Sequence, residues 1–234
     1  MHPSGKPEHL NFVNHDLADR VKALVWSILA NGGTPAAALE LGQQAVFLAD
    51  YLISHFEAEN QLPHAIACRE GCNYCCFNQV EVTPPEAMLI GDYVVRNFSA
   101  ADREALLARM RQSAQRKAGK SKKKIARQRH RLPCALLVAG RCSVYPVRPL
   151  VCRAMHAFEA ESCKPERRQG PLTAGAFYAH RYEIVWSISA GLKTGCGELG
   201  CQTGVLDLDR ALLDWFAATG PAERWVRGEM VFTI

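Results

Sequence analysis

The sequence predicts a mostly α fold with irregular, cysteine-rich loops and at most short strands. Apolar residues recur at steps of three and four in the first and last thirds of the chain, which indicates amphipathic helices. Strand-like alternation is confined to a few residues, and the ten cysteines stand mostly between the helical stretches. With 234 residues, 48% of them hydrophobic, the chain can build a sizeable core without disulfide staples.

Residues 1–63 predict an N-terminal helical segment. One helix ends at Asn31-Gly32-Gly33, and a second begins where Thr34 is an N-cap and Pro35 is the first helical residue. Pro63 closes the segment. The apolar stripe of the first helix consists of Leu10, Val13, Leu17, Val21, Leu24 and Ile28.

Residues 64–165 predict a metal-binding core in which helices separate two cysteine groups. Residues 77–82 alternate like a short strand, with Val80 and Val82 on one side. Thr83-Pro84-Pro85-Glu86 is a capping-box pattern that predicts the start of a helix, and another helix starts near Ser99.

Residues 166–234 predict a C-terminal helical segment. One helix begins near Ala174 and is expected to break at Gly195 and Gly197, and a last helix stops at Gly220-Pro221. We expect the three segments to form one compact domain.

Residues 111–131 are strongly basic, with Ile125 as their only large apolar residue. We interpret this stretch as a solvated helix end or a disordered linker. The alternative is a patch for RNA, DNA or an acidic protein. Because no aromatic residue interleaves the charges for base stacking, a nucleic-acid partner is not expected.

Composition predicts a soluble, cytoplasmic protein. The net charge of +5 is mild, residues 1–10 contain no apolar leader, and no stretch of about 20 apolar residues predicts a membrane span. In a reducing compartment, ten cysteines are better explained as metal ligands or redox thiols than as disulfides.

The strongest chemical signal is the first cysteine group, Cys68, Cys72, Cys75 and Cys76, four thiols within nine residues. Short loops let the chain wrap around an ion, as in a zinc site with four ligands at ~2.3 Å or an iron–sulfur cluster. The Cα atoms of Cys75 and Cys76 are ~3.8 Å apart, which makes a single shared ion awkward. The pair fits better if the two thiols serve different metals or different irons of one cluster.

The second cysteine group is Cys134, Cys142, Cys152 and Cys163. Pro146 and Pro149 predict a rigid loop around it. Arg148 and Arg153 stay charged at any working pH, so we interpret them as cofactor-binding residues that offset the negative charge of several thiolates. The alternative for both is an ordinary surface ion pair.

These motifs carry a resemblance. Cys68-x3-Cys72-x2-Cys75-Cys76, followed by Cys142-Ser-Val-Tyr-x2-Arg148-Pro-x2-Cys152-Arg153, resembles the YkgJ-type cysteine-cluster family, which is described as zinc- or iron-chelating. The resemblance covers about 68–163 and implies eight metal ligands: Cys68, Cys72, Cys75, Cys76, Cys134, Cys142, Cys152 and Cys163. Cys196 and Cys201 fall outside it, either as a further ligand pair or as packing thiols.

A second resemblance competes with the first. Cys68-x3-Cys72-x-Tyr74-Cys75 is similar to the three-cysteine motif of radical S-adenosylmethionine enzymes, whose folds resemble (β/α) barrels. Here the motif follows two long helices, and repeated strand–helix units are missing, so the context does not favour this interpretation. His64 and His156 are weaker ligand candidates that would replace a cysteine.

The sequence therefore predicts a metal-binding protein with a multi-cysteine site. We favour an iron–sulfur cluster over Zn²⁺, with a redox or electron-transfer role or a cluster-dependent modification of a protein or peptide. Eight thiols exceed the need of one four-ligand site, so either two sites or one cluster with a resolving thiol pair is expected. The alternative is a zinc-stapled interaction module that uses the basic segment. The partner is a protein, a peptide or a small molecule, no membrane is involved, and whether the chain is an oxidoreductase or another enzyme stays open.

Overall fold

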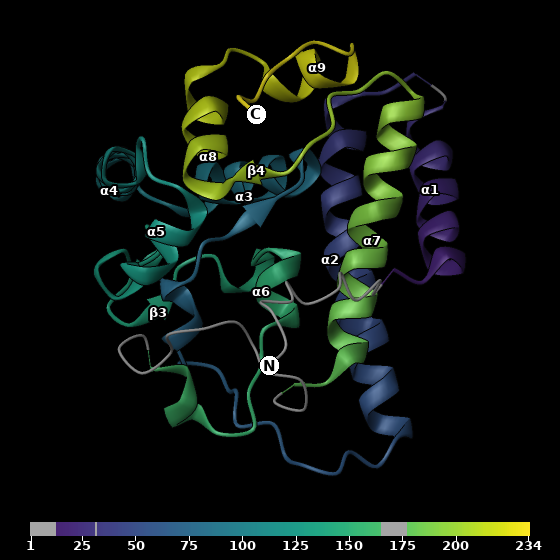
Figure 1. Ribbon diagram of the computed structural model, residues 1–234. Helices are drawn as coiled ribbons and strands as arrows, with labels where there is room; N and C mark the ends of the chain where they lie inside the picture. Colours follow the sequence, from purple (N-terminus) through teal and green to yellow (C-terminus); the bar gives the residue numbers. More distant parts are fainter. Residues whose placement is uncertain (1–12, 31, 165–176) are drawn as a thin grey trace, which may run out of the picture.

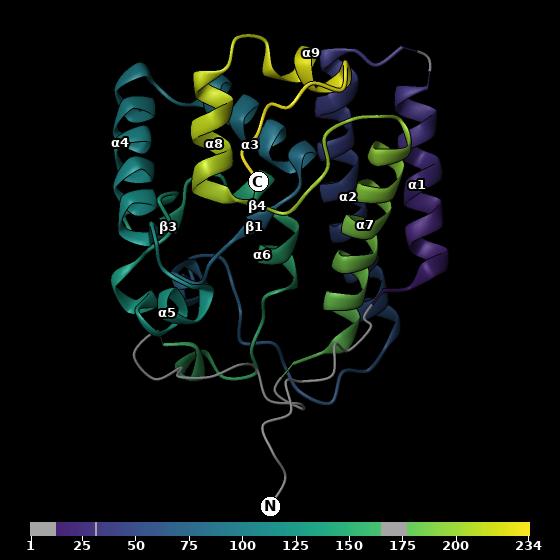
Figure 2. The ribbon, with the colours of Figure 1, turned by 45° about the horizontal axis from the view of Figure 1, so that its top comes forward.

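Three long helices form one side of the molecule in the computed structural model, which describes residues 13–30, 32–164 and 177–234 (Figure 1). They are α1 (His15–Leu29), α2 (Pro35–Glu59) and α7 (Ala179–Glu198). Both views place them side by side (Figures 1 and 2), although α7 lies more than a hundred residues after α2 in the sequence. We call this group the helical layer.

Glycines let α1 and α7 approach closely. A Cβ atom at Gly195 would lie 2.8 Å from the Cβ of Val25, closer than real side chains come. The sequence predicted that Gly195 and Gly197 break the helix, but α7 continues to Glu198. The glycines serve packing here, because a residue without a side chain admits the neighbouring helix.

A second set of helices continues the fold beyond α2. It consists of α3 (Pro84–Asn97), α4 (Ala100–Lys117), α8 (Leu208–Ala217) and α9 (Pro221–Val226). α3 packs between α2 and α8, and α4 packs against α8. The core runs through both sets, with Leu41, Met88, Ile188, Leu212 and Trp225 among its fully buried side chains.

Strands are few and short, as the sequence predicted. β1 (Glu81–Val82) pairs antiparallel with β4 (Leu206–Asp207), with Glu81 opposite Asp207 and Val82 opposite Leu206. β2 (Leu137–Val138) pairs with β3 (Arg141–Cys142). The strand expected over 77–82 is reduced to its last two residues. The mostly α prediction is thus confirmed.

Short elements make up the cysteine-rich region below these helices in Figure 1. They are η1 (Tyr74–Phe77), α5 (Lys122–Arg127), η2 (Arg129–Arg131), η3 (Tyr145–Val147), α6 (Leu150–Ala154) and η4 (Ala160–Cys163). The basic segment is therefore helical over most of its length: α4 runs to Lys117, and α5 follows with Ile125 buried.

The predicted helix starts have the expected caps. The Thr34 hydroxyl accepts from the Ala37 N–H at 3.1 Å, and the Ser99 hydroxyl accepts from the Asp102 N–H at 3.1 Å. The helix expected from Leu10 begins at His15, with residues 1–12 outside the described part, and the helix expected from Ala174 begins at Ala179. None of the helices in the described residues is both long and apolar enough to cross a membrane.

Candidate metal centre

The first cysteine group lies on a chain of tight turns after α2. The Cys72 N–H donates to the Arg69 carbonyl at 3.0 Å, and Gly71 adopts a φ of 86°, which favours glycine. The Cys76 N–H then donates to the Asn73 carbonyl at 3.0 Å within η1. These turns keep the four cysteines of the first group within one short loop.

The second cysteine group is joined directly to the first. The Cys134 N–H donates to the Cys76 carbonyl at 2.7 Å. The Asn73 side chain also reaches across, and its Nδ2 donates to the Gly140 carbonyl at 2.9 Å. These two bonds tie together loops that lie about sixty residues apart in the sequence.

A tight hairpin places Cys142 at the site. Leu137 pairs with Cys142 across β2 and β3, and the two connecting residues, Ala139 and Gly140, have φ angles of 49° and 76°. Positive φ at both positions is typical of the two-residue turn whose twist matches a hairpin. The sequence offered only Gly140 as a signal for this turn, since alanine rarely adopts such an angle.

Six cysteines from the two groups line one cavity of about 60 Å³. Its apolar wall includes Val80, Leu136, Pro149 and Leu208, and its polar wall includes Arg141, Tyr145 and Arg148. The lining cysteines are Cys72, Cys75, Cys76, Cys134, Cys142 and Cys152. We call this space the cysteine cavity. Arg141 and Tyr145 were not singled out from the sequence.

Cys68 and Cys163 are not among the lining residues. Cys68 is exposed, and η4, which ends at Cys163, contacts η1. Burial of part of its side chain raises the pKa of Cys68, and the neighbouring charges of Cys72 and Cys163 act in the same direction. The structure therefore separates the eight predicted ligands into six inner thiols and two outer ones.

Four of the inner thiols have pKa values raised above the ordinary value of a cysteine, which favours their neutral form. Burial raises the pKa of Cys134 to about 12 and raises the pKa of Cys152 well above its ordinary value. A hydrogen bond with Cys75, followed by burial, raises the pKa of Cys76. Burial also raises the pKa of Cys142, while the positive charge of Arg148 opposes it. A bound cation would reverse this balance, because thiolates are the ligating form.

The two arginines predicted at the site have different positions. Arg148 lines the cavity, and its guanidinium lies 4.3 Å from the centre of the Tyr145 ring. Its Nε atom is buried and has no hydrogen-bond partner among the described residues. Arg153 is buried but is not a lining residue. Its Nε donates to the Arg148 carbonyl at 3.0 Å, and its Nη2 donates to the Pro146 carbonyl at 2.8 Å.

Arg153 therefore acts on the loop rather than on the cavity. Its third polar atom, Nη1, pairs with Asp50 of α2. One guanidinium thus fixes the turn that carries Arg148 and attaches that turn to the helical layer. Each of the three guanidinium nitrogens thus binds a different acceptor, which the planar, rigid guanidinium group of arginine allows.

Glu86 holds the helix that carries Cys152. Its Oε2 accepts from the N–H and the hydroxyl of Thr83 at 2.8 and 2.7 Å, as the capping-box pattern predicted. Its Oε1 accepts from the N–H of Leu150, the first residue of α6, at 2.7 Å. The sequence pattern contained no signal for this second contact.

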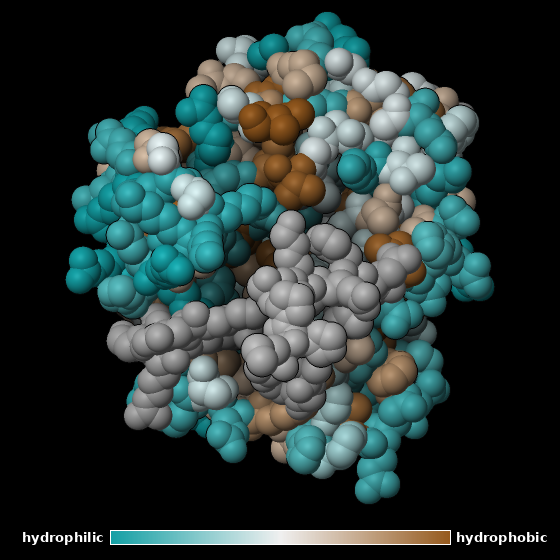
Figure 3. All heavy atoms as spheres, viewed as in Figure 1, coloured by the Kyte–Doolittle hydropathy of each residue, from teal (hydrophilic) through white to brown (hydrophobic). Residues whose placement is uncertain are grey.

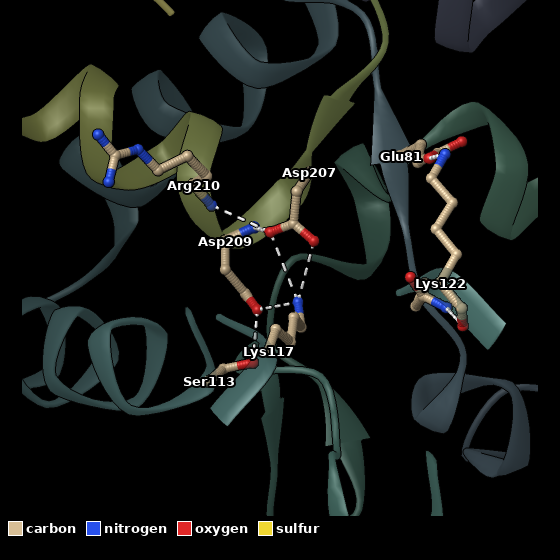
Figure 4. A network of polar contacts seen from close by, with 8 residues as sticks. Glu81, Ser113, Lys117, Lys122, Asp207, Asp209 and Arg210 are labelled. Atoms are coloured by element: carbon tan, nitrogen blue, oxygen red, sulfur yellow. Dashed lines mark hydrogen bonds and ion pairs between the residues drawn. The ribbon is translucent and has the colours of Figure 1, made fainter. Parts of the chain in front are cut away.

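A polar network lies at the start of α8 (Figure 4). The Lys117 ammonium donates to Asp209 at 2.6 Å and to Asp207 at 3.1 Å, and the Ser113 hydroxyl donates to Asp209 at 2.6 Å. Burial alone would lower the pKa of Lys117, but Asp209 and Asp207 raise it. The network joins α4 to the start of α8, and Arg109 of α4 donates to the Ala135 carbonyl at 2.9 Å.

Cys196 and Cys201 are packing thiols at the end of α7. The Cys201 N–H donates to the Cys196 carbonyl at 2.9 Å, and the Gly200 N–H donates to the Gly197 carbonyl at 3.0 Å with a φ of 77° at Gly200. This is the Schellman pattern, in which the residues at the positions of Cys196 and Cys201 make the accompanying apolar contact. Both thiols are buried in the core, and neither lines the cysteine cavity.

The two candidate histidines do not line the cavity either. His156 is buried, its Nδ1 lies 2.8 Å from the Ala154 carbonyl, and its Nε2 accepts from the Tyr178 N–H at 2.6 Å. Both ring nitrogens are therefore engaged by the backbone in the neutral ring. Burial lowers the pKa of His156, which agrees with that assignment.

The donor set fits a thiophilic metal, because soft thiolates select zinc, copper(I) and iron–sulfur clusters. Within residues 13–30, 32–164 and 177–234, no three His, Cys, Asp or Glu side chains form a ready-made metal group. The six thiols instead line one cavity together.

Comparison with known proteins gives one match. Residues 67–169 match the model of the CxxCxxCC family, described as a putative zinc- or iron-chelating domain. The chain has three residues, Arg69, Glu70 and Gly71, between its first two cysteines, where that name has two. No curated protein and no solved structure matches the chain.

Proposed function

We propose that the cysteine cavity is the metal site and that it holds an iron–sulfur cluster, because residues 67–169 match a family described as a putative zinc- or iron-chelating domain. The observation that carries this proposal is the number of inner thiols. Six cysteines share one cavity, whereas a single structural zinc ion needs four ligands.

The arrangement of the thiols favours more than one metal atom. Cys75 and Cys76 are adjacent in η1, yet both line the cavity. Neighbouring side chains diverge, so two metal atoms accommodate such a pair better than one. Cys72, Cys134, Cys142 and Cys152 complete the set of thiols that line the cavity. A bound cluster would supply one-electron transfer at this position.

Arg148 has the role of a charge-balancing residue in this proposal. Several thiolates around one metal centre carry excess negative charge, and a guanidinium on the cavity wall offsets it. Arg153 keeps Arg148 in place through the backbone of residues 146–148. Hydrogen bonds and positive charges next to cluster sulfurs also raise a reduction potential, so Arg148 is expected to tune it.

A zinc-stapled module is the second candidate. It is favoured by the irregular backbone of the region, since metal cross-links commonly replace a core where loops cannot build one. The fold gives less support to a radical S-adenosylmethionine enzyme. The described residues contain only two antiparallel pairs of two-residue strands, whereas those enzymes resemble (β/α) barrels.

Anaerobic purification followed by metal analysis and a visible spectrum tests the proposal. Coloured protein with iron and acid-labile sulfide in equal amounts supports the cluster. Colourless protein with stoichiometric zinc and no sulfide contradicts it and selects the zinc candidate. Bleaching on addition of S-adenosylmethionine and reductant, with release of deoxyadenosine, would select a radical S-adenosylmethionine enzyme.

A further inference from the structure

The charges of this chain are segregated to an unusual degree. Residues 105–158 hold fourteen of the 28 Lys and Arg residues and no Asp or Glu. The rest of the chain carries all 23 carboxylates against fourteen cations. The net charge of +5 is therefore the sum of a strongly positive part, residues 105–158, and a negative remainder.

The positive part is folded against the cysteine cavity. The Gln79 side chain donates to the Lys122 carbonyl at 3.0 Å, and Arg129 donates to the Asn78 side chain at 2.7 Å. Asn78 and Gln79 lie two and three residues after Cys76, the last cysteine of the first group. These contacts, with buried Ile125, attach α5 and η2 beside the cavity.

Several cations of this part face solvent and have no carboxylate to neutralise them. Lys117, Lys122 and Arg153 pair with carboxylates of the chain. Seven others are exposed and have no carboxylate partner among the described residues. Four of these seven lie on α5 and β3, and we call them the cationic surface: Lys123, Lys124, Arg127 and Arg141.

The cationic surface reaches the edge of the metal site. Arg141 lies on β3 and lines the cysteine cavity, and β3 and α5 occupy the same side of the molecule in both ribbon views (Figures 1 and 2). The space-filling view shows a broad hydrophilic area over α4 and α5 (Figure 3). A ligand on this area would lie next to the inner thiols.

We propose that the cationic surface docks an acidic segment of a partner polypeptide beside the cysteine cavity. Carboxylate side chains would complement the exposed ammonium and guanidinium groups, and the uncompensated field would steer the partner to this face. The inference concerns the surface alone, so it stands or falls independently of which metal the cavity holds.

Two other anionic partners fit the surface less well. Nucleic-acid binding without base readout uses aromatic side chains next to the cations. Here the exposed aromatics Trp26, Phe47, Tyr51 and Trp186 lie on α1, α2 and α7, on the other side of the molecule from α5 (Figure 1). A membrane-binding helix exposes large apolar residues, whereas Ile125 of α5 is buried.

The test measures binding of a fluorescein-labelled polyglutamate peptide to the full chain by anisotropy, at about 50 mM and about 300 mM salt. The docking variant is Lys123→Gln/Lys124→Gln/Arg127→Gln. The matched control, Arg20→Gln/Arg96→Gln/Lys193→Gln, removes the same charge from exposed positions on α1, α3 and α7. Thermal melts of both variants verify that the fold is kept.

We expect salt-sensitive binding that weakens about tenfold in the docking variant, the loss typical of three exposed ion pairs, and changes less than about twofold in the control. Equal losses in both variants, or no binding at the lower salt, would overturn the proposal. Tighter binding of a labelled thymidine oligonucleotide, or of vesicles of phosphatidylcholine and phosphatidylglycerol, would overturn the choice of an acidic polypeptide.

Discussion

Cys134 at the cysteine cavity and Cys196 at the end of α7 have similar pKa values but differ in their surroundings. Burial raises the pKa of both Cys134 and Cys196 to about 12. Yet Cys134 shares a cavity wall with five other thiols, whereas Cys196 contacts the core and Cys201 at a helix end. A raised pKa thus reports burial, and only a shared open space distinguishes a ligand from a packing residue.

The largest expected effect follows from that distinction. Replacing both Cys134 and Cys152 by serine should abolish stoichiometric metal binding, because a hydroxyl is a poor substitute for a soft thiolate. Replacing both Cys196 and Cys201 by alanine should leave the metal content unchanged, since neither thiol lines the cavity. Metal analysis of the two purified variants measures the difference. Equal metal loss in both would remove the distinction between the two sets.

The sequence allowed some of this separation to be predicted. The mostly α fold is confirmed, and residues 67–169 match a cysteine-cluster family as the resemblance predicted, because helical periodicity and cysteine spacing are local patterns. The split into six inner and two outer thiols was not predictable, since it depends on how residues 68–76 meet residues 134–163. Spacing alone also left Cys196 and Cys201 open, and only their hydrogen bonds at the end of α7 show that they pack.

Contacts that act at long range were equally hidden. Glu86 was expected to cap its own helix, and it does, but its bond to Leu150 spans 64 residues. Gly195 was expected to end a helix, because a glycine within a helical pattern reads as a stop signal. A side chain at this position would instead collide with Val25, a residue 170 positions earlier, and no local pattern contains that information.

The second prediction concerns Glu86, the residue of α3 that binds the first residue of α6. Glu86→Ala would leave the Thr83 and Leu150 N–H groups buried without an acceptor, so we expect a loss of about 2–4 kcal/mol in the free energy of unfolding. Glu86→Gln keeps one acceptor oxygen and should lose less. Urea unfolding of both variants measures the effect.

Because Leu150 begins the helix that carries Cys152, Glu86→Ala should also weaken metal binding. Competition with a chromophoric chelator would measure that affinity. A variant that lost stability but bound metal as tightly as the wild type would show that α6 does not depend on Glu86 for its position.

The third prediction tests the helical layer, where apolar contact replaces hydrogen bonding. Gly195→Ala would place a methyl group 2.8 Å from Val25, so the helices must separate at a cost of about 1–3 kcal/mol. The metal content should not change, because α7 does not line the cysteine cavity. Gly197→Ala is the matched control, since the nearest atom there lies 3.5 Å away. If the two variants unfold at the same urea concentration, close packing of α1 on α7 is not what Gly195 provides.

The smallest expected effect is a pH dependence of the stability, caused by the contact of His156 between α6 and α7. His156 follows α6, and its Nε2 accepts from the Tyr178 N–H just before α7, so protonation of that nitrogen removes the bond. The folded-state pKa of His156 lies below its ordinary value of about 6.5, because burial disfavours the charged ring. The unfolded chain therefore takes up the proton first. Stability should be fully present above about pH 6.5 and should fall as the pH drops below it.

Urea unfolding at several pH values measures this dependence of stability on pH. His156→Gln should reduce the dependence, whereas replacement of the exposed His55 should not. A wild-type slope that persists in His156→Gln would assign the dependence to other groups.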